Sequence, residues 1–340
     1  MRFGCSLRWE LHESPGDWRE PGFIGSHLVD ALLAQGVEVR CLVRRQSNRR
    51  WLSGKPVELV EASLSDPESL SVAVKGIDVV YHVAGLIAAR SYEEFLRGNR
   101  DATAHLIEAV LRWAPNLQRF VFLSSLAAVG PARSLMEPVT EDTPYHPVTA
   151  YGKSKQAAEE VLLSIMDKLP ITIIRPPAVY GPRDAATLPF FRSVRLGIAP
   201  LVGFREKYLS LVHVSDLVRG ILLAASAPHA TGRLYCISSE EFYTWMQLTE
   251  AARVAIGRRR IWRLRVPHTL VMGIASIAEV AGWFMQRPPV FDFEKGRDIL
   301  QPYWICSPER AQKELGYRQS VSLVEGMRET VAWYYEHGWL

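Results

Sequence analysis

Two side chains with complementary proton chemistry lie one helical turn apart in the segment Tyr151-Gly152-Lys153-Ser154-Lys155. Tyr151 and Lys155 occupy positions i and i+4 of a predicted helix, so both emerge on one face. A phenol with an ordinary pKa of about 10 is a poor base at neutral pH, and a neighbouring ammonium favours its ionised form. The spacing suits general acid/base catalysis, although helix surfaces also contain it by chance.

Two hydroxyls, Ser124 and Ser125, follow the apolar run Arg119–Leu123. We expect this run to be a strand, which places both serines at its carboxyl end. A serine there can donate a hydrogen bond to a carbonyl oxygen on which negative charge develops. The alternative is a turn or a helix cap.

Short β-rich runs alternate with helical stretches from residue 22 to about residue 237. Strands are predicted at 37–43, 57–60, 78–83, 119–123 and 171–174, and helices at 25–34, 67–74, 101–113 and 151–166. Apolar strands separated by helices are typical of an α/β protein whose parallel sheet is covered on both faces. Such a Rossmann-type sheet binds its ligand at the carboxyl ends of the strands.

The chain divides into two predicted domains. Residues 1–174 form a doubly wound dinucleotide-binding domain, and residues 175–340 form a smaller, mostly helical substrate cap, from which 209–237 return to the sheet. Helices are expected in the cap at 244–256, 269–284, 308–314 and 323–335. The cap contains Trp245, Trp262, Trp283, Phe284, Phe291 and Phe293.

Composition excludes several classes of function. The 340 residues carry a net charge of only +4, which gives no indication of nucleic-acid binding. Four cysteines without a close pair argue against a disulfide framework or a metal site and favour a reducing compartment, the cytoplasm. No apolar run is long enough to predict a transmembrane helix.

The motifs together identify a family. The chain resembles the extended short-chain dehydrogenases/reductases, also called the NAD-dependent epimerase/dehydratase family. The matching segments, in family order, are Gly22-Phe23-Ile24-Gly25, Tyr81-His82-Val83-Ala84-Gly85, Ser124-Ser125 with Gly130, Tyr151 to Lys155, Arg175 to Pro182, and His213-Val214-Ser215-Asp216.

The resemblance implies roles for these residues. Tyr151 would be the general acid/base, and Lys155 would hold the nicotinamide ribose and lower the pKa of the tyrosine. Ser125 would orient the carbonyl, with Ser124 as the second choice. Asn99 matches a helix asparagine that organises a proton-relay water, with a surface helix cap as the alternative. The cofactor contacts implied are Gly22, Phe23, Ile24, Gly25, Arg44, Arg45, Ser63, Leu64, Val83, Ala84, Gly85, Tyr151, Lys155, Pro177 and Val179.

Cofactor choice depends on the residues after the second strand. An acid there binds the ribose 2′-hydroxyl, whereas arginine accommodates a 2′-phosphate. Arg44 and Arg45 stand at this position, so we expect NADP, with NAD as the alternative. Ser63 replaces an aspartate that the family places near the adenine.

The N-terminus departs from the family pattern. Arg19 stands where the first loop glycine belongs, and 11–17 lack the expected apolar strand. Reading the codons of residues 12–20 one base later permits Met-Lys-Val-Leu-Val-Thr-Gly-Ala, so residues 1–20 are interpreted as out of frame and cofactor binding by the chain as written is expected to be weak. The alternative is a genuine terminus in which Phe3–Leu7 supplies a substitute strand.

Two departures from the pattern of nucleotide-sugar members indicate the branch of the family. Nucleotide-sugar members carry an asparagine at Pro177 and an arginine within 208–211, and this chain has neither. It looks more like 3β-hydroxysteroid dehydrogenases and dihydroflavonol reductases, which interconvert a secondary alcohol and a ketone on a hydrophobic molecule. A nucleotide-sugar epimerase or dehydratase and a non-catalytic dinucleotide-binding protein are the alternatives. The resemblance also implies a homodimer.

Two further features stay open. His82 lies in a predicted strand and is interpreted as a core histidine rather than a ligand. The segment 257–266 alternates arginine with apolar residues. A solvated basic edge, an acidic substrate tail and a membrane surface are the three interpretations of this segment.

Overall fold

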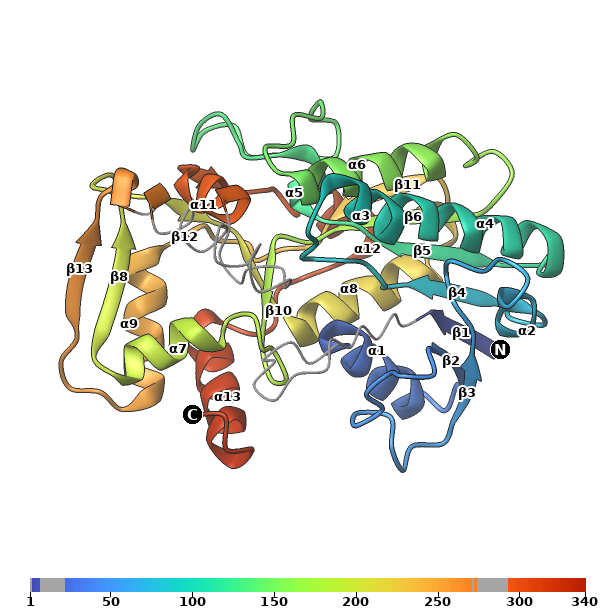
Figure 1. Ribbon diagram of the computed structural model, residues 1–340, viewed down its shortest axis with the longest axis horizontal. Helices are drawn as coiled ribbons and strands as arrows, with labels where there is room; N and C mark the ends of the chain where they lie inside the picture. The colour runs from blue at the N-terminus through green and yellow to red at the C-terminus, as the bar shows by residue number, and fades with distance from the viewer. Residues whose placement is uncertain (1, 7–21, 271, 274–292) are drawn as a thin grey trace.

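The computed structural model describes residues 2–6, 22–270, 272–273 and 293–340. A seven-stranded sheet forms its centre in the order β11-β6-β5-β4-β1-β2-β3 (Figure 1). Every neighbouring pair in this sheet is parallel. The strands are β1 (Arg2–Ser6), β2 (Glu38–Val43), β3 (Val57–Glu61), β4 (Val79–His82), β5 (Arg119–Leu123), β6 (Ile171–Arg175) and β11 (Arg233–Cys236). The predicted Rossmann-type fold is confirmed.

The first strand is present, which corrects the expectation that it is lost. Arg2–Ser6 lies between β2 and β4, with Phe3 opposite Val39 on one side and Val79 on the other. A central strand needs free backbone donors and acceptors on both edges, and this proline-free segment provides them. The strand agrees with the alternative interpretation, in which Phe3–Leu7 takes the place of the strand expected at residues 11–17. Those residues, with Trp18, Arg19 and Glu20, lie outside the described part.

Helices cover both faces of the sheet (Figure 1). Alternate strand residues point to opposite faces, so Val80 and Phe122 pack in one core and Tyr81 and Leu123 in the other. The first core faces α2 (Leu70–Val74), α4 (Ala102–Trp113) and α6 (Ala150–Leu163). The second faces α1 (Phe23–Ala34), α8 (Val214–Ser226) and α12 (Glu309–Leu315).

Shorter elements connect these layers. They are α3 (Tyr92–Leu96), the π-helix Arg97–Asp101, α5 (Leu126–Val129), the 3₁₀ turn Pro228–Ala230, and the parallel pair β7 (Ala178–Tyr180) and β10 (Leu211–His213). The strand β11 and helix α8 bring part of 209–237 back to the central sheet and its core.

The cap is helical with additional short strands that sequence reasoning did not foresee. Its helices are α7 (Leu188–Arg195), α9 (Trp245–Ile256), α11 (Phe293–Leu300) and α13 (Leu323–Glu336). Its strands are β8 (Ile198–Val202), β9 (Tyr208–Leu209), β12 (Tyr243–Thr244), β13 (Trp262–Val266) and β14 (Tyr303–Trp304). A third core joins α7, α9 and α13. In the part of the chain that is described, no helix has the length and apolar character needed to cross a bilayer.

Candidate active site

Helix α6 carries the predicted acid/base pair in its first two turns. The Thr149 side chain caps this helix by accepting a hydrogen bond from the Gly152 backbone at 3.1 Å. Lys155 is only 4% exposed, and its Nζ donates to the Leu123 carbonyl at 2.7 Å while lying 4.4 Å from the centre of the Phe122 ring. The ammonium therefore sits at the carboxyl end of β5, where a Rossmann sheet binds its ligand.

Ser125 and Tyr151 come together at this end of the sheet. The Ser125 side chain caps α5 by accepting from the Ala127 backbone at 3.1 Å, and it lies close enough to the Tyr151 phenol to lower the pKa of that phenol. The helix-capping role that the sequence left open for Ser125 is thus present. Its position beside the phenol is compatible with the other role, a hydrogen bond to a carbonyl oxygen.

Burial dominates the protonation of the pair. It raises the pKa of Tyr151 to about 12, with the Ser125 hydrogen bond opposing this shift and the Asp298 carboxylate adding to it. It also lowers the pKa of Lys155 to about 8, against the attraction of Glu159. The expected lowering of the phenol pKa by the ammonium is therefore not found, since desolvation of the phenolate is the largest cause of the shift and Lys155 is not among its causes. Tyr151 is a protonated acid at neutral pH.

Ser124 belongs to a different network. Its hydroxyl donates to Glu159, whose carboxylate is fully buried and accepts from Arg175 Nη2 at 2.6 Å and from the Tyr145 hydroxyl at 2.7 Å. Arg175 also donates to the Glu141 carbonyl at 3.0 Å. The second choice for the carbonyl-orienting serine is thus bound to a carboxylate inside the protein, which leaves Ser125 as the hydroxyl beside Tyr151.

Asn99 lies beneath the pair, within the π-helical turn. Its side chain accepts from the Leu86 backbone at 2.7 Å and donates to the Leu86 carbonyl at 3.1 Å and to the Ser154 hydroxyl at 2.8 Å. With 2% exposure it is not a surface cap. A Cβ added at Gly85 would lie 3.0 Å from Asn99 Oδ1 and 3.4 Å from Lys155 Nζ. Only glycine leaves this approach to the lysine open.

The predicted cofactor residues follow the carboxyl ends of the strands. Gly22, with a φ of 92°, is the N-cap of α1, and Phe23, Ile24 and Gly25 form the first turn of that helix. A left-handed glycine before a helix N-terminus suits a pyrophosphate, because the free backbone N–H groups point outward. Arg44 and Arg45 come after β2, Ser63 and Leu64 after β3, Val83 to Gly85 after β4, and Pro177 and Val179 after β6. These residues fit a dinucleotide.

Two contributions were missed by sequence reasoning. Glu294 of α11 accepts a hydrogen bond from the Ala150 backbone, and Asp298, one turn later, is close enough to raise the pKa of Tyr151. Helix α11 therefore lies against the first turn of α6, over the acid/base pair. The i, i+4 spacing of these two acids places them on one helix face, which was the available signal.

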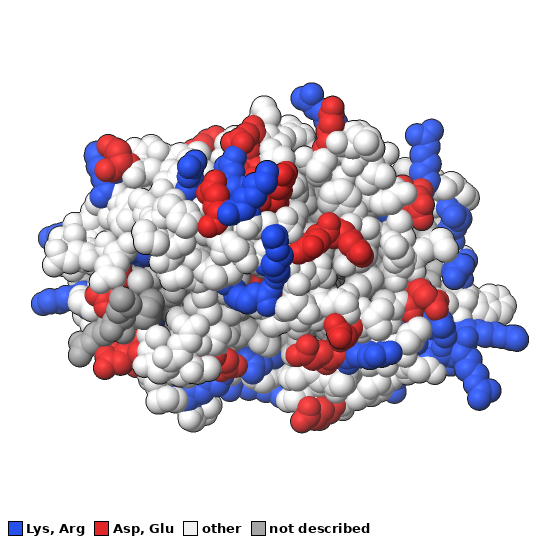
Figure 2. Space-filling view, turned by 180° about the vertical axis from the view of Figure 1, so that it is seen from behind, with Lys and Arg blue, Asp and Glu red and all other residues white. Residues whose placement is uncertain are grey.

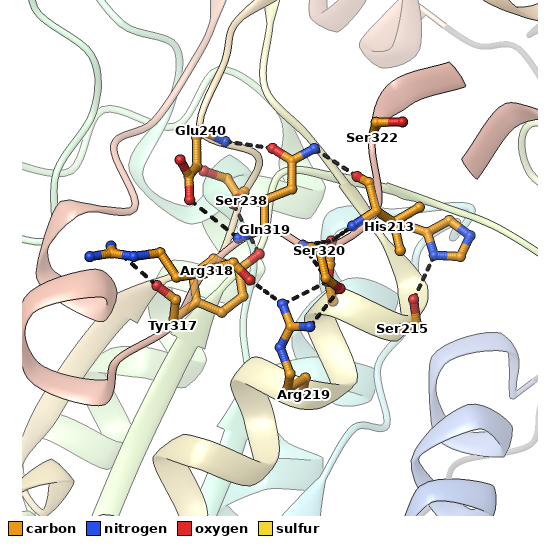
Figure 3. A network of polar contacts seen from close by, with 12 residues as sticks. His213, Ser215, Arg219, Ser238, Glu240, Tyr317, Arg318, Gln319, Ser320 and Ser322 are labelled. Atoms are coloured by element: carbon orange, nitrogen blue, oxygen red, sulfur yellow. Dashed lines mark hydrogen bonds and ion pairs between the residues drawn. The ribbon is translucent and has the colours of Figure 1, made fainter. Parts of the chain in front are cut away.

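Two other motif residues, His82 and Asp216, have structural roles. His82 is 1% exposed, and its Nε2 lies 3.0 Å from Thr103 Oγ1, which confirms a core histidine. In the His213 to Asp216 motif, the Asp216 carboxylate accepts from Arg219 at 2.8 Å and from the Ser320 and Val321 backbones at 3.1 and 3.0 Å. Figure 3 shows Arg219 and Ser320 side by side in this network. The acid anchors the segment that leads to α13.

Two tryptophans of the predicted cap set, Trp245 and Trp262, have different surroundings. Trp245 packs against the cap core next to Phe190, whereas Trp262 is 82% exposed. Trp283, Phe284 and Phe291 lie outside the described residues. The two described tryptophans do not by themselves define a substrate site.

Comparison with known proteins agrees with the geometry. The sequence profile of the NAD dependent epimerase/dehydratase family matches residues 21–238. Ceramide reductase of Caulobacter vibrioides is 32% identical over 321 residues, which are 94% of this chain and 93% of that protein. Sterol demethylase protein B of Methylococcus capsulatus is 30% identical over 325 residues, 93% of this chain and 97% of that protein.

Solved structures share the fold over the same length. The crystal structure of gox2253 has a TM-score of 0.77 and 26% identity, covering 94% of this chain and 97% of that one. DesIV, a dTDP-glucose 4,6-dehydratase of Streptomyces venezuelae solved with NAD, has a TM-score of 0.75 and 25% identity, covering 94% and 96%.

Proposed function

The chain belongs to the NAD-dependent epimerase/dehydratase family and is an NAD(P)-dependent oxidoreductase, and we propose that it reduces a ketone on a hydrophobic small molecule to a secondary alcohol, reversibly. One observation carries the proposal: Ser125 and the phenol of Tyr151 lie close together at the carboxyl end of β5, with the buried Lys155 ammonium at the same strand end. This arrangement supports a role for both hydroxyls as donors to one carbonyl oxygen.

The side chains would divide the reaction as follows. When bound, NAD(P)H supplies the hydride that the carbonyl carbon receives. Ser125 donates a hydrogen bond to the carbonyl oxygen, and Tyr151 gives its proton to that oxygen as the C=O bond becomes a C–O–H group. Lys155 holds the ribose and stabilises the phenolate that remains. In the oxidative direction the phenolate takes the proton back.

The substrate class rests on the relatives and on the motif departures. The names ceramide reductase and sterol demethylase protein B both refer to lipids. Pro177 and the segment 208–211 lack the asparagine and arginine of nucleotide-sugar members. A nucleotide sugar is the competing substrate, favoured by the structural likeness to a dTDP-glucose dehydratase.

NADP is the proposed cofactor. Arg44 and Arg45 follow β2 directly, and Glu61 at the end of β3 is paired with Arg49. A 2′-phosphate near these guanidinium groups would gain charge-assisted hydrogen bonds. Arg44→Asp should therefore raise the KM for NADPH by roughly tenfold to a hundredfold while leaving that for NADH nearly unchanged. Equal effects on both cofactors would contradict the assignment.

A substrate screen with matched serine variants tests the function. NADPH oxidation would be followed with long-chain ketones, keto-sterols and a panel of UDP- and dTDP-sugars. Ser125→Ala should lower kcat about a hundredfold on the accepted ketone, whereas Ser124→Ala should keep most of the rate and lose stability instead. Turnover of a nucleotide sugar alone, or equal kcat for the two variants, would reject the proposal.

The oligomeric state and compartment complete the proposal. A groove between α4 and α6 is lined by the apolar side chains Ile107, Leu111, Val161 and Ile165, and Leu111 is 44% exposed. We propose that two copies pair these helices in a homodimer. Leu111→Asp should then yield monomers in sedimentation, and an unchanged dimer would reject this face.

The free thiols Cys41, Cys236 and Cys306 suit the cytoplasm.

A further inference from the structure

The two-stranded ribbon β8–β13 at the far end of the cap has one buried and one exposed face. Trp262 pairs with Ile198 and Leu264 with Pro200, and paired residues share a face. The intervening residues Ala199 and Leu201 of β8 are 1% and 8% exposed, because that side packs on the cap. The other side therefore faces outward.

This outward face is apolar. Trp262 is 82% exposed, Leu264 58% and Ile198 44%, and Pro200 is exposed beside them. Phe204 and Leu270, which follow the two strands, are 70% and 53% exposed. Scattered exposed apolar residues are ordinary, but a contiguous group of this kind marks an interaction surface.

Arginines lie next to the apolar face. The ten residues 257–266 contain five arginines and no Asp or Glu, and all five are exposed. Arg263 and Arg265 pair with Ala199 and Leu201 and so belong to the other side of the ribbon, and Arg258 donates to the Arg195 carbonyl at 2.7 Å. Arg259 and Arg260 directly precede the strand that carries Trp262, and Lys and Arg side chains project from this end of the molecule in the view from behind (Figure 2). Exposed Trp and Leu beside exposed Arg is the composition of an interfacial membrane-binding surface.

We propose that the outward face of β8–β13 docks on an anionic phospholipid surface, with Trp262 and Leu264 entering the headgroup region and the arginines binding lipid phosphates. A second copy of this chain is a poorer occupant, because a symmetric contact would place each arginine group against its own like charges. The inference does not depend on the reductase activity. It selects the membrane among the three interpretations of 257–266.

Vesicle co-sedimentation tests the proposal on the full chain. The protein should sediment with vesicles of phosphatidylcholine mixed with phosphatidylglycerol and remain in solution with phosphatidylcholine alone. The double variant Trp262→Ser, Leu264→Ser should bind at least tenfold more weakly. The double variant Arg259→Gln, Arg260→Gln should lose roughly fivefold for each charge removed, and high salt should release the wild-type chain.

Matched controls separate this surface from general stickiness. Val72→Ser removes an apolar side chain that is 62% exposed on α2, at the opposite end of the molecule in Figure 1, and Lys168→Gln removes an exposed charge. Both should bind as the wild type does. Since all the substituted side chains are exposed, thermal unfolding should be unchanged in every variant. The Tyr151→Phe protein should also bind normally, which keeps this test independent of catalysis.

Tryptophan fluorescence with brominated lipid tests whether Trp262 contacts the membrane. Brominated lipid should quench tryptophan fluorescence in the wild type and quench it less in Trp262→Phe. Three outcomes would overturn the proposal: no sedimentation with anionic vesicles, equal binding to neutral ones, or unchanged binding by the Trp262, Leu264 variant. A concentration-dependent dimer lost in Trp262→Ser, without vesicle binding, would overturn it in favour of self-association.

Discussion

Helix α6 buries two ionisable side chains one turn apart, and their surroundings differ. Glu159 accepts hydrogen bonds from Arg175, Ser124 and Tyr145, so its charge is fully compensated. Lys155, in the described part of the chain, donates one hydrogen bond, to the Leu123 carbonyl, although an ammonium has three donors. The same helix thus holds one saturated charge and one that is left with donors to spare.

This difference separates a structural role, that of the Glu159 network, from a catalytic role, that proposed for Lys155. A buried ion pair whose oxygens and protons are all engaged fixes the geometry of the elements it joins, here α6, β6 and the end of β5. A buried cation with unused donors costs stability, and under the proposed function the cofactor ribose would accept them. Ser124 and Ser125 differ in the same way, since the Ser124 hydroxyl donates to the Glu159 carboxylate and Ser125 lies beside the Tyr151 phenol.

The largest effect should come from replacing Tyr151, one helical turn before the Lys155 ammonium. Tyr151→Phe removes the proton donor, and kcat for ketone reduction should fall by roughly 10²–10⁴, a far larger change than that in the cofactor affinity measured by fluorescence titration. The control Tyr145→Phe removes a phenol from the saturated network, so it should keep its rate and lose about 1–3 kcal/mol of stability. A Tyr151→Phe enzyme with its full rate would abolish the distinction and favour a non-catalytic protein.

Substitutions in the Glu159 network should lower the free energy of unfolding. Arg175→Met leaves the fully buried Glu159 carboxylate without its cation, and the free energy of unfolding in urea should fall by about 3–5 kcal/mol. The double variant Glu159→Leu, Arg175→Met should recover much of this loss, because no charge remains buried. If the single variant unfolded at the wild-type urea concentration, the pair would not be the support described here.

The pH dependence should report Lys155. Burial lowers its pKa to about 8, so the folded chain releases this proton before the unfolded chain does. Between about pH 8 and the unperturbed lysine pKa of about 10.4, the unfolded state binds more protons than the folded state. Lys155 therefore makes the free energy of unfolding rise with pH in this range. The rate of ketone reduction should fall above about pH 8 as the cation is lost. Lys155→Arg should move that limb to higher pH, and an unmoved limb would assign it elsewhere.

The smallest effect should come from crowding the open side of the lysine. Gly85→Ala places a methyl group 3.0 Å from Asn99 Oδ1 and 3.4 Å from Lys155 Nζ. A strain of about 1 kcal/mol should lower kcat/KM roughly fivefold. Gly273→Ala is the control, because a Cβ there meets nothing within 4 Å. Equal kinetics for the two variants would show that the space beside Lys155 is not used.

Local sequence pattern was enough to predict many of the strands and helices. The strands at 119–123 and 171–174 were predicted within a residue of β5 and β6, since buried parallel strands are continuous apolar runs. The i, i+4 pair of α6 and the serines after β5 followed from the same local rules. The missed strand β13 alternates Arg with apolar residues and pairs with β8, which is distant in sequence.

The sequence by itself therefore determined most elements of the Rossmann sheet, the family and the candidate residues, because periodicity and motif spacing are properties of neighbours along the chain. Only the tertiary structure decided that Arg2–Ser6 is an inner strand of the sheet, that Ser125 rather than Ser124 lies beside Tyr151, and that α11 lies against α6. These outcomes depend on which groups from distant segments satisfy each other's hydrogen bonds and exclude water, and no local rule contains that information.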